Sequence, residues 1–171
     1  MDAKDIHPLK KVKVYKFLQN LIFVLALFCI DRFSKIYIID LTEKTDTTLI
    51  YLTPFLNSYL IWNSGIAFGL FSLSNEITYN LFTLLIIFIN LVVLYLAFKI
   101  KDIRKFFFLL ILGGSLGNLF DRIYYGSVPD FIDFHLGNFH WFIFNIADIF
   151  ITVGVICLIL AELLYKKEVN E

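Results

Sequence analysis

Four long apolar segments constrain the fold of this chain more than any other feature of its sequence. They cover about residues 17–39, 77–98, 106–125 and 144–165, and the second carries no charged side chain. Each is long enough for a helix that crosses a bilayer, which takes about 20 residues. Helices are expected because lipid offers no hydrogen-bond partner to free N–H and C=O groups. The pattern predicts an integral membrane, all-α four-helix bundle that forms a single domain over residues 1–171.

The composition supports a membrane protein and excludes several other classes. Hydrophobic residues make up 59% of the chain, and its mean hydropathy is +0.77, whereas a soluble domain is roughly 45–50% apolar. This excess excludes a disordered protein, a small secreted domain built on disulfides and an ordinary cytosolic enzyme.

The cysteines and the two histidines near residue 140 form no recognisable redox or metal motif. Cys29 and Cys157 lie inside apolar segments without a CxxC pattern, so we expect both to be buried in packing. His135 and His140 are five residues apart and lack an obvious third ligand, so we expect an interfacial or structural role. No metal and no other cofactor is predicted.

The basic residues indicate how the chain is oriented, because cytoplasmic segments of membrane proteins carry an excess of Lys and Arg. Eleven of the 15 basic residues lie in three segments: before the first apolar stretch, between the second and third, and after the fourth. These segments fall on one side of a four-helix chain, so both termini are predicted to be cytoplasmic. The eleven are Lys4, Lys10, Lys11, Lys13, Lys16, Lys99, Lys101, Arg104, Lys105, Lys166 and Lys167.

The long loop between the first two apolar segments has the composition of short strands. Between Thr47 and Phe71 it is rich in β-branched and aromatic residues, interrupted by turn-forming residues such as Pro54 and Gly65. Its aromatic side chains suit the level of the lipid headgroups. We predict a small extracytoplasmic β-cradle over about residues 45–71; a loop with a helix is the alternative.

Charged and amide side chains gather at the outer ends of the predicted helices and in the outer loops. Ionisable groups within membrane segments are costly and suggest function. The alternative is that Arg32, Lys35 and Arg122 form structural ion pairs or extend to the interface. The residues at this outer level are Asp31, Arg32, Lys35, Asn63, Asp121, Arg122, Asp130, Asp133, Asn145 and Asp148.

Two carboxylates close together in a poorly hydrated place would share one proton. The ionised one can take a proton from water, while the protonated one binds a carbonyl oxygen and later protonates the leaving amine. Asp31 and Asp121 each precede an arginine, so we expect ion pairs there. Asp148 has no basic neighbour in sequence. Spacing alone leaves its partner open between Asp130 and Asp133, which would not share a face of an extended segment.

Other functions remain possible on these residues alone. A small transporter would use the Asp and Arg groups as an ion path and would predict polar residues at all depths. A non-enzymatic membrane scaffold would use them to join helices. A serine hydrolase is disfavoured, because Ser34 and Lys35 are neighbours that point about 100° apart on a helix, and Ser115 has no base nearby in sequence.

Five blocks of residues, taken in order, resemble lipoprotein signal peptidase, the type II signal peptidase of bacteria. The resemblance extends from about Lys16 to Tyr165. The blocks are Asp31-Arg32-Phe33-Ser34-Lys35, Asn63-Ser64-Gly65-Ile66-Ala67-Phe68-Gly69, Gly113-Gly114-Ser115-Leu116-Gly117-Asn118-Leu119-Phe120-Asp121-Arg122, Val128-Pro129-Asp130-Phe131-Ile132-Asp133-Phe134 and Phe144-Asn145-Ile146-Ala147-Asp148.

The resemblance implies an intramembrane aspartyl endopeptidase of the bacterial inner membrane with its active site at the outer face. The substrate would be a prolipoprotein, cleaved before a cysteine that carries diacylglycerol. Membrane lipid is the other expected partner, nucleic acid is not, and a monomer is expected.

The same resemblance assigns the catalytic pair to Asp130 and Asp148, which spacing had left ambiguous. A second group would line or shape the site. Pro129 departs from the family pattern and removes a backbone donor next to Asp130. The second group comprises Asp31, Lys35, Asn63, Gly113, Asn118, Asp121, Arg122, Asn145 and Ala147.

Overall fold

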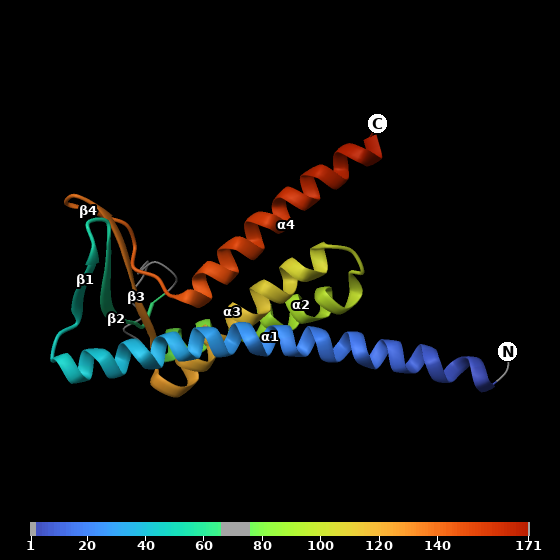
Figure 1. The fold of residues 1–171 in the computed structure, drawn as a ribbon, viewed down its shortest axis with the longest axis horizontal. Helices are drawn as coiled ribbons and strands as arrows, with labels where there is room; N and C mark the ends of the chain where they lie inside the picture. The colour runs from blue at the N-terminus through green and yellow to red at the C-terminus, as the bar shows by residue number, and fades with distance from the viewer. Residues whose placement is uncertain (1–2, 66–75, 171) are drawn as a thin grey trace.

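The computed structural model of this chain describes the backbone of residues 3–65 and 76–170, and the side chains of residues 13–65 and 76–164. The described part is mostly helical, with a small antiparallel sheet at one end of the helices (Figure 1). The predicted cradle residues 66–71 lie outside it. Its elements are α1 (Ala3–Thr45), β1 (Leu49–Thr53), β2 (Leu56–Asn63), α2 (Glu76–Lys99), α3 (Arg104–Tyr125), β3 (Val128–Leu136), β4 (Phe139–His140) and α4 (Ile146–Asn170).

Each predicted apolar segment coincides with a helix. α2 and α3 begin and end within two residues of the predicted boundaries. α1 is longer than its apolar segment and continues to Thr45, because no glycine or proline interrupts its second half; the chain turns at Asp46, where φ is 50°. By length and composition, α2, α3 and Ile146–Leu164 of α4 can each cross a membrane. α1 is not among these three.

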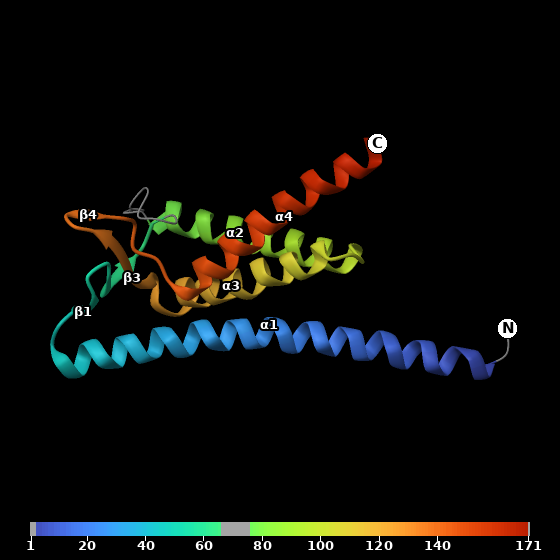
Figure 2. The same ribbon diagram turned by 45° about the horizontal axis from the view of Figure 1, so that its top comes forward.

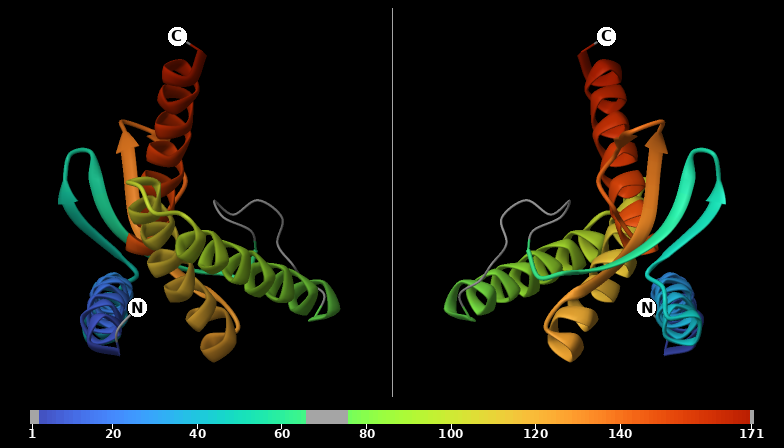
Figure 3. Two further views of the ribbon diagram at one scale, coloured as in Figure 1. Left: turned by 90° about the vertical axis from the view of Figure 1, so that its right-hand side faces the viewer. Right: turned by 90° about the vertical axis from the view of Figure 1, so that its left-hand side faces the viewer.

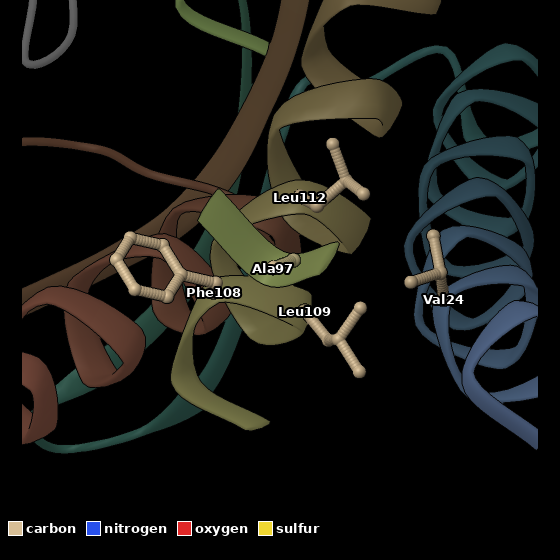
Figure 4. Packing of buried hydrophobic residues seen from close by; sticks show 5 residues of the cluster. All are labelled: Val24, Ala97, Phe108, Leu109 and Leu112. Atoms are coloured by element: carbon tan, nitrogen blue, oxygen red, sulfur yellow. The ribbon is translucent and has the colours of Figure 1, made fainter. Parts of the chain in front are cut away.

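Helix α3 is the common neighbour of the other helices. α1, α2 and α4 each pack against α3, and α4 also contacts α1. They spread from α3 in different directions (Figure 2 and Figure 3). In the described residues three helices thus surround α3, and this arrangement does not confirm a regular four-helix bundle. The buried apolar cluster that joins α1, α2 and α3 contains Val24, Ala97, Phe108, Leu109 and Leu112 (Figure 4).

Many large apolar side chains face outward from the helices. Phe88 and Leu91 of α2 and Leu163 of α4 are each more than half exposed, which is typical of surfaces covered by lipid or by another chain.

The expectation of buried cysteines is wrong for Cys29, which is exposed on α1, whereas Cys157 is partly buried; both are free thiols. Cys29 is next to Ile30, an apolar side chain that is 52% exposed on the same helix.

The sheet contains more of the chain than the predicted cradle. Its four strands lie in the order β1-β2-β3-β4 and are antiparallel. β1 and β2 come from the predicted cradle, whereas β3 and β4 come from the loop between α3 and α4. The chain enters β3 through Gly126, whose φ of 70° ends α3 in a left-handed conformation that glycine adopts readily. This turn places the start of β3 beside the end of α3.

Candidate active site

Asp148 is held at the start of α4 by a capping box. The Asn145 side-chain oxygen accepts the backbone N–H of Asp148 at 3.1 Å, and Asp148 Oδ2 accepts the backbone N–H of Asn145 at 3.1 Å. These bonds satisfy N–H groups that the first turn of a helix leaves free. The preceding residue, Phe144, exchanges backbone hydrogen bonds with Ile132 of β3. The beginning of α4 is therefore tied to the sheet.

Asp130 is positioned by the pairing of β3 with β2. It lies opposite Ile61 and is 2% exposed. Asn63, at the end of β2, donates from Nδ2 to Asp130 Oδ2 at 2.8 Å. Pro129 lies opposite Trp62 as the second residue of β3, a place near a strand end that a proline can occupy. The carboxylate of Asp130 thus stays in place beside the proline.

A single asparagine connects the two carboxylates. Asn145 donates from Nδ2 to Asp130 Oδ1 at 2.6 Å, while its backbone N–H and its side-chain oxygen bond Asp148. Asp130 and Asp148 line one cavity of about 550 Å³ together with Asn63, Asn118 and Arg122. Most other walls are apolar and come from α2 and α4: Phe82, Ile86, Ile89, Ile151, Val155 and Ile156.

Behind the cavity lies a buried group of charged side chains. Lys35 is 0% exposed and donates from Nζ to Asp31 at 2.8 Å, Asp121 at 2.6 Å and the Asn118 side-chain oxygen at 2.8 Å. Since its oxygen is bound to Lys35, the Asn118 amide turns its NH₂ group outward and donates to Asp148 Oδ1 at 2.8 Å. Lys35 therefore sets the direction of the amide that contacts Asp148.

None of the buried ion pairs in the described residues joins adjacent residues: Lys35 and Asp31 lie one helical turn apart on α1, and the two pairs with Asp121 join α1 to α3. Asp31 and Asp121 were expected to pair with the arginines that follow them, but Arg32 pairs with Asp121 and Lys35 pairs with both carboxylates. Neighbours in a helix diverge by about 100°, which keeps adjacent side chains apart. Asp31 also accepts the backbone N–H of Ala147 at 2.9 Å. This bond joins α1 to the start of α4.

Arg122 contacts backbone oxygens. Its guanidinium donates to the carbonyls of Asn118 at 3.2 Å and Gly65 at 3.3 Å, and Tyr79 of α2 donates to the carbonyl of Arg122 at 3.0 Å. The arginine therefore joins α3 to the chain segment that follows β2.

Glycines on α3 let the neighbouring helices approach closely. A Cβ on Gly113 would lie 2.7 Å from Leu27 Cβ of α1, and one on Gly114 would overlap the carbonyl of Ala147. A Cβ on Gly117 would overlap the Asp31 carboxylate. Larger residues would separate α1 and α4 from α3 and displace both Asp31 and Asp148.

Asp133, the competing candidate, belongs to a different environment. His140 Nδ1 lies 2.9 Å from Asp133 Oδ1, and Asn57 of β2 donates to Asp133 at 3.3 Å. The rings of His135 and His140 stack with centroids 5.0 Å apart. As expected for an extended strand, Asp130 and Asp133 do not share a face. A structural role for the two histidines agrees with these contacts.

The surroundings of Asp130 favour its protonated form. Burial raises the pKa of Asp130 to about 6, and the negative charge of Asp148 adds to this effect. Hydrogen bonds from Asn63 and Asn145 act in the opposite direction. The balance follows from the cost of a charge in a poorly hydrated place.

The carboxylates and amides of the cavity were predicted from the sequence, but the wall formed by Phe82, Ile86 and Ile89 on α2 was not. Their spacing of three and four residues places them on one helical face, and this is the signal that was available. Ser115 was considered as a nucleophile; it lines the cavity and accepts a hydrogen bond from Asn90 at 2.8 Å.

Comparison with known proteins identifies the family. A sequence model described as signal peptidase (SPase) II matches residues 23–164. The chain is 50% identical to the lipoprotein signal peptidase of Pelagibacter ubique (strain HTCC1062) over 164 residues, which cover 95% of this chain and 99% of that protein. The chain belongs to the signal peptidase II family.

Two further comparisons extend this assignment to a second relative and to solved structures. The lipoprotein signal peptidase of Francisella tularensis subsp. novicida (strain U112) is 42% identical and covers 85% of this chain and 93% of its own. A bacterial membrane enzyme solved by the in meso method at 2.3 Å resolution has a TM-score of 0.70 at 32% identity, over 90% of this chain and 92% of that one. A second, at 1.9 Å, has a TM-score of 0.66 at 33% identity, over 85% and 92%.

Membership of the signal peptidase II family makes this chain a bacterial membrane peptidase that removes signal peptides from prolipoproteins. The resemblance inferred from the five sequence blocks is confirmed.

Proposed function

We propose that this chain is an aspartic endopeptidase that cuts diacylglyceryl-modified prolipoproteins immediately before the lipidated cysteine, with Asp130 and Asp148 as its catalytic pair. One observation carries the proposal: the two carboxylates line the same largely apolar cavity and are joined through Asn145. An apolar cavity suits a lipidated substrate, and a carboxylate pair suits water-mediated peptide hydrolysis.

In the proposed mechanism Asp130 holds the shared proton and Asp148 is ionised. Asp148 takes a proton from water as the water oxygen attacks the scissile carbonyl carbon, while Asp130 donates a hydrogen bond to the carbonyl oxygen. The carbon–nitrogen bond then breaks and the leaving amine takes a proton from the pair. The products are the carboxyl group of the signal peptide and the free amine of the lipidated cysteine. Asn63 and Arg122 are assigned to holding substrate carbonyls.

The membrane arrangement is part of the same proposal. We place four spanning segments, including residues 17–39 of α1, in the bacterial inner membrane with both termini in the cytoplasm. Asp130 and Asp148 then lie at the outer face, where the signal peptide and the lipid tails reach them from within the bilayer. The protein would act as a monomer and without a cofactor.

The direct test uses the purified full chain and a synthetic prolipopeptide in detergent or lipid. With a diacylglyceryl group on the cysteine, we expect a single cut whose product begins with the lipidated cysteine, identified by mass spectrometry. The matched peptide without the lipid should not be cut. Cleavage elsewhere, or equal cleavage of both peptides, would contradict the proposal.

A second prediction concerns the pH dependence of kcat/KM, which reports the free enzyme. In the proposed mechanism Asp148 is already ionised, and its charge adds to the burial that raises the pKa of Asp130 to about 6. Loss of the Asp130 proton then leaves both carboxylates ionised. We therefore expect kcat/KM to fall as the pH rises through about 6. Asn63 stabilises the ionised form of Asp130, so Asn63→Ala should raise the pKa of Asp130 and move this decline to higher pH.

The control for the pH experiment is Asn57→Ala, which removes the corresponding amide beside Asp133. It should leave the position of the decline unchanged. A decline that stays in place in Asn63→Ala, or moves to lower pH, would contradict the assignment of the shared proton to Asp130.

A further inference from the structure

Two hydroxyl groups lie in the catalytic cavity, each one helical turn from the carboxylate level. Ser115 precedes Asn118 on α3 by three residues, and Thr152 follows Asp148 on α4 by four. α3 and α4 run in opposite directions (Figure 2), and the Asn118–Asp148 hydrogen bond sets their relative level. With a rise of about 1.5 Å per residue, both hydroxyls lie roughly 5 Å farther along the cavity, away from the sheet. Both line it.

Within residues 13–65 and 76–164, neither hydroxyl proton has a hydrogen-bond acceptor. By contrast, the hydroxyls of Ser34, Thr42 and Thr83 each donate to a carbonyl of their own helix. Ser115 Oγ instead accepts from Asn90 Nδ2, which directs its own proton away from Asn90. Thr152 is exposed and Ser115 is half-buried, so a ligand in the cavity can reach both hydroxyls and supply an acceptor.

The surrounding wall defines the chemistry of that ligand. At this level the cavity is lined by Ile86 and Ile89 of α2 and by Ile151, Val155 and Ile156 of α4. The matching group is an apolar chain that carries a neutral acceptor close to the scissile bond. The ester carbonyls of a diacylglyceryl group meet this description: each is a neutral acceptor at the head of an apolar chain, a few bonds from the cysteine sulfur.

We propose that the hydroxyls of Ser115 and Thr152 donate hydrogen bonds to the two ester carbonyls of the substrate diacylglyceryl group, and so select ester-linked over ether-linked lipid. This inference rests on the proposed function, because it places the lipid of that substrate in this cavity. Ser115 and Thr152 act here as specificity-determining residues. Asn90 positions Ser115 from behind and makes no contact with the lipid.

The test compares two prolipopeptides that differ in one linkage, a diacylglyceryl and a dialkylglyceryl form, with the full chain and each variant. For the wild type we expect kcat/KM to favour the diester by roughly tenfold or more. Ser115→Ala and Thr152→Val should each reduce this preference by roughly threefold, as expected for loss of one hydrogen bond, and the double variant should remove it. The kcat/KM for the diether should change little.

Thr83→Val is the matched control, because its hydroxyl already donates to Tyr79 and lies outside the described cavity lining; it should keep the wild-type preference. The inference is overturned if the wild type cuts both substrates equally, or if Ser115→Ala and Thr152→Val slow both substrates to the same extent. A wild type that cuts neither substrate overturns the proposed function and this inference with it.

Discussion

Replacing either Asp130 or Asp148 with asparagine is expected to reduce cleavage of a diacylglyceryl prolipopeptide by roughly 10²–10⁴-fold, the range typical of a lost general acid or base. The amide keeps the size of the carboxyl group but can neither take a proton from water nor deliver one to the leaving amine. Removing a buried charge does not in itself destabilise the protein, so both variants should remain folded. Initial rates and melting temperatures in detergent measure the two effects separately.

The matched control is Asp133→Asn, three residues from Asp130 on the same strand and equally buried. Asp133 contacts His140 and Asn57 and lies on the other face of β3. Its variant should keep most of the activity, even if the loss of the His140 contact lowers the melting temperature. Retained cleavage in both Asp130→Asn and Asp148→Asn, or an equal loss in Asp133→Asn, would refute the assignment of the pair.

The helices could be predicted because their signal is local. A run such as residues 77–98 has the length and composition of a spanning helix before any tertiary contact forms. The length of α1 could not be predicted in this way, because hydropathy indicates where lipid would cover a helix and not where the helix ends. Its last turns lie beyond the apolar segment and end at Thr45, just before the turn at Asp46.

Which segments join the sheet as strands depends on pairing between parts of the chain that are distant in sequence. Asn63 and Asp130 are 67 residues apart in the chain, and their hydrogen bond exists because β2 and β3 are neighbours. Alternation along residues 128–134 could separate the faces of Asp130 and Asp133. The alternation could not predict which of the two faces lines the cavity, since that depends on where α4 begins.

One local signal for the site was present in the sequence and was used only in part. Asn145 and Asp148 have the spacing of a capping box, which predicts both the first residue of α4 and the direction of the Asp148 carboxylate. The charged group behind the site carries no comparable signal. The pairing of Lys35 and Arg32 with the two aspartates depends on how α1 crosses α3. The order of residues in the chain suggested other pairs.

The second large effect is expected for Lys35→Met, a change that preserves the length and volume of the side chain. Lys35 is fully buried and bonds two carboxylates and an amide, so its loss leaves Asp31 without its cation. Breaking a buried ion pair from one side costs about 3–5 kcal/mol, which corresponds to a decrease in melting temperature of roughly 10 °C for a chain of this size. Cleavage measured well below the melting temperature of the variant should also slow, because Asn118 loses the bond that directs its NH₂ group to Asp148.

Two companion variants separate charge from packing. Lys44→Met removes an ion pair with Asp40 from the same helix, but the Lys44 side chain is 71% exposed, and such pairs contribute little; its melting temperature should match that of the wild type. Asp31→Asn combined with Lys35→Met removes the uncompensated charge while keeping an acceptor for the N–H of Ala147, so it should melt above Lys35→Met alone. If Lys35→Met melts like the wild type, or if the double variant melts lower still, the buried charges do not stabilise the junction of α1, α3 and α4.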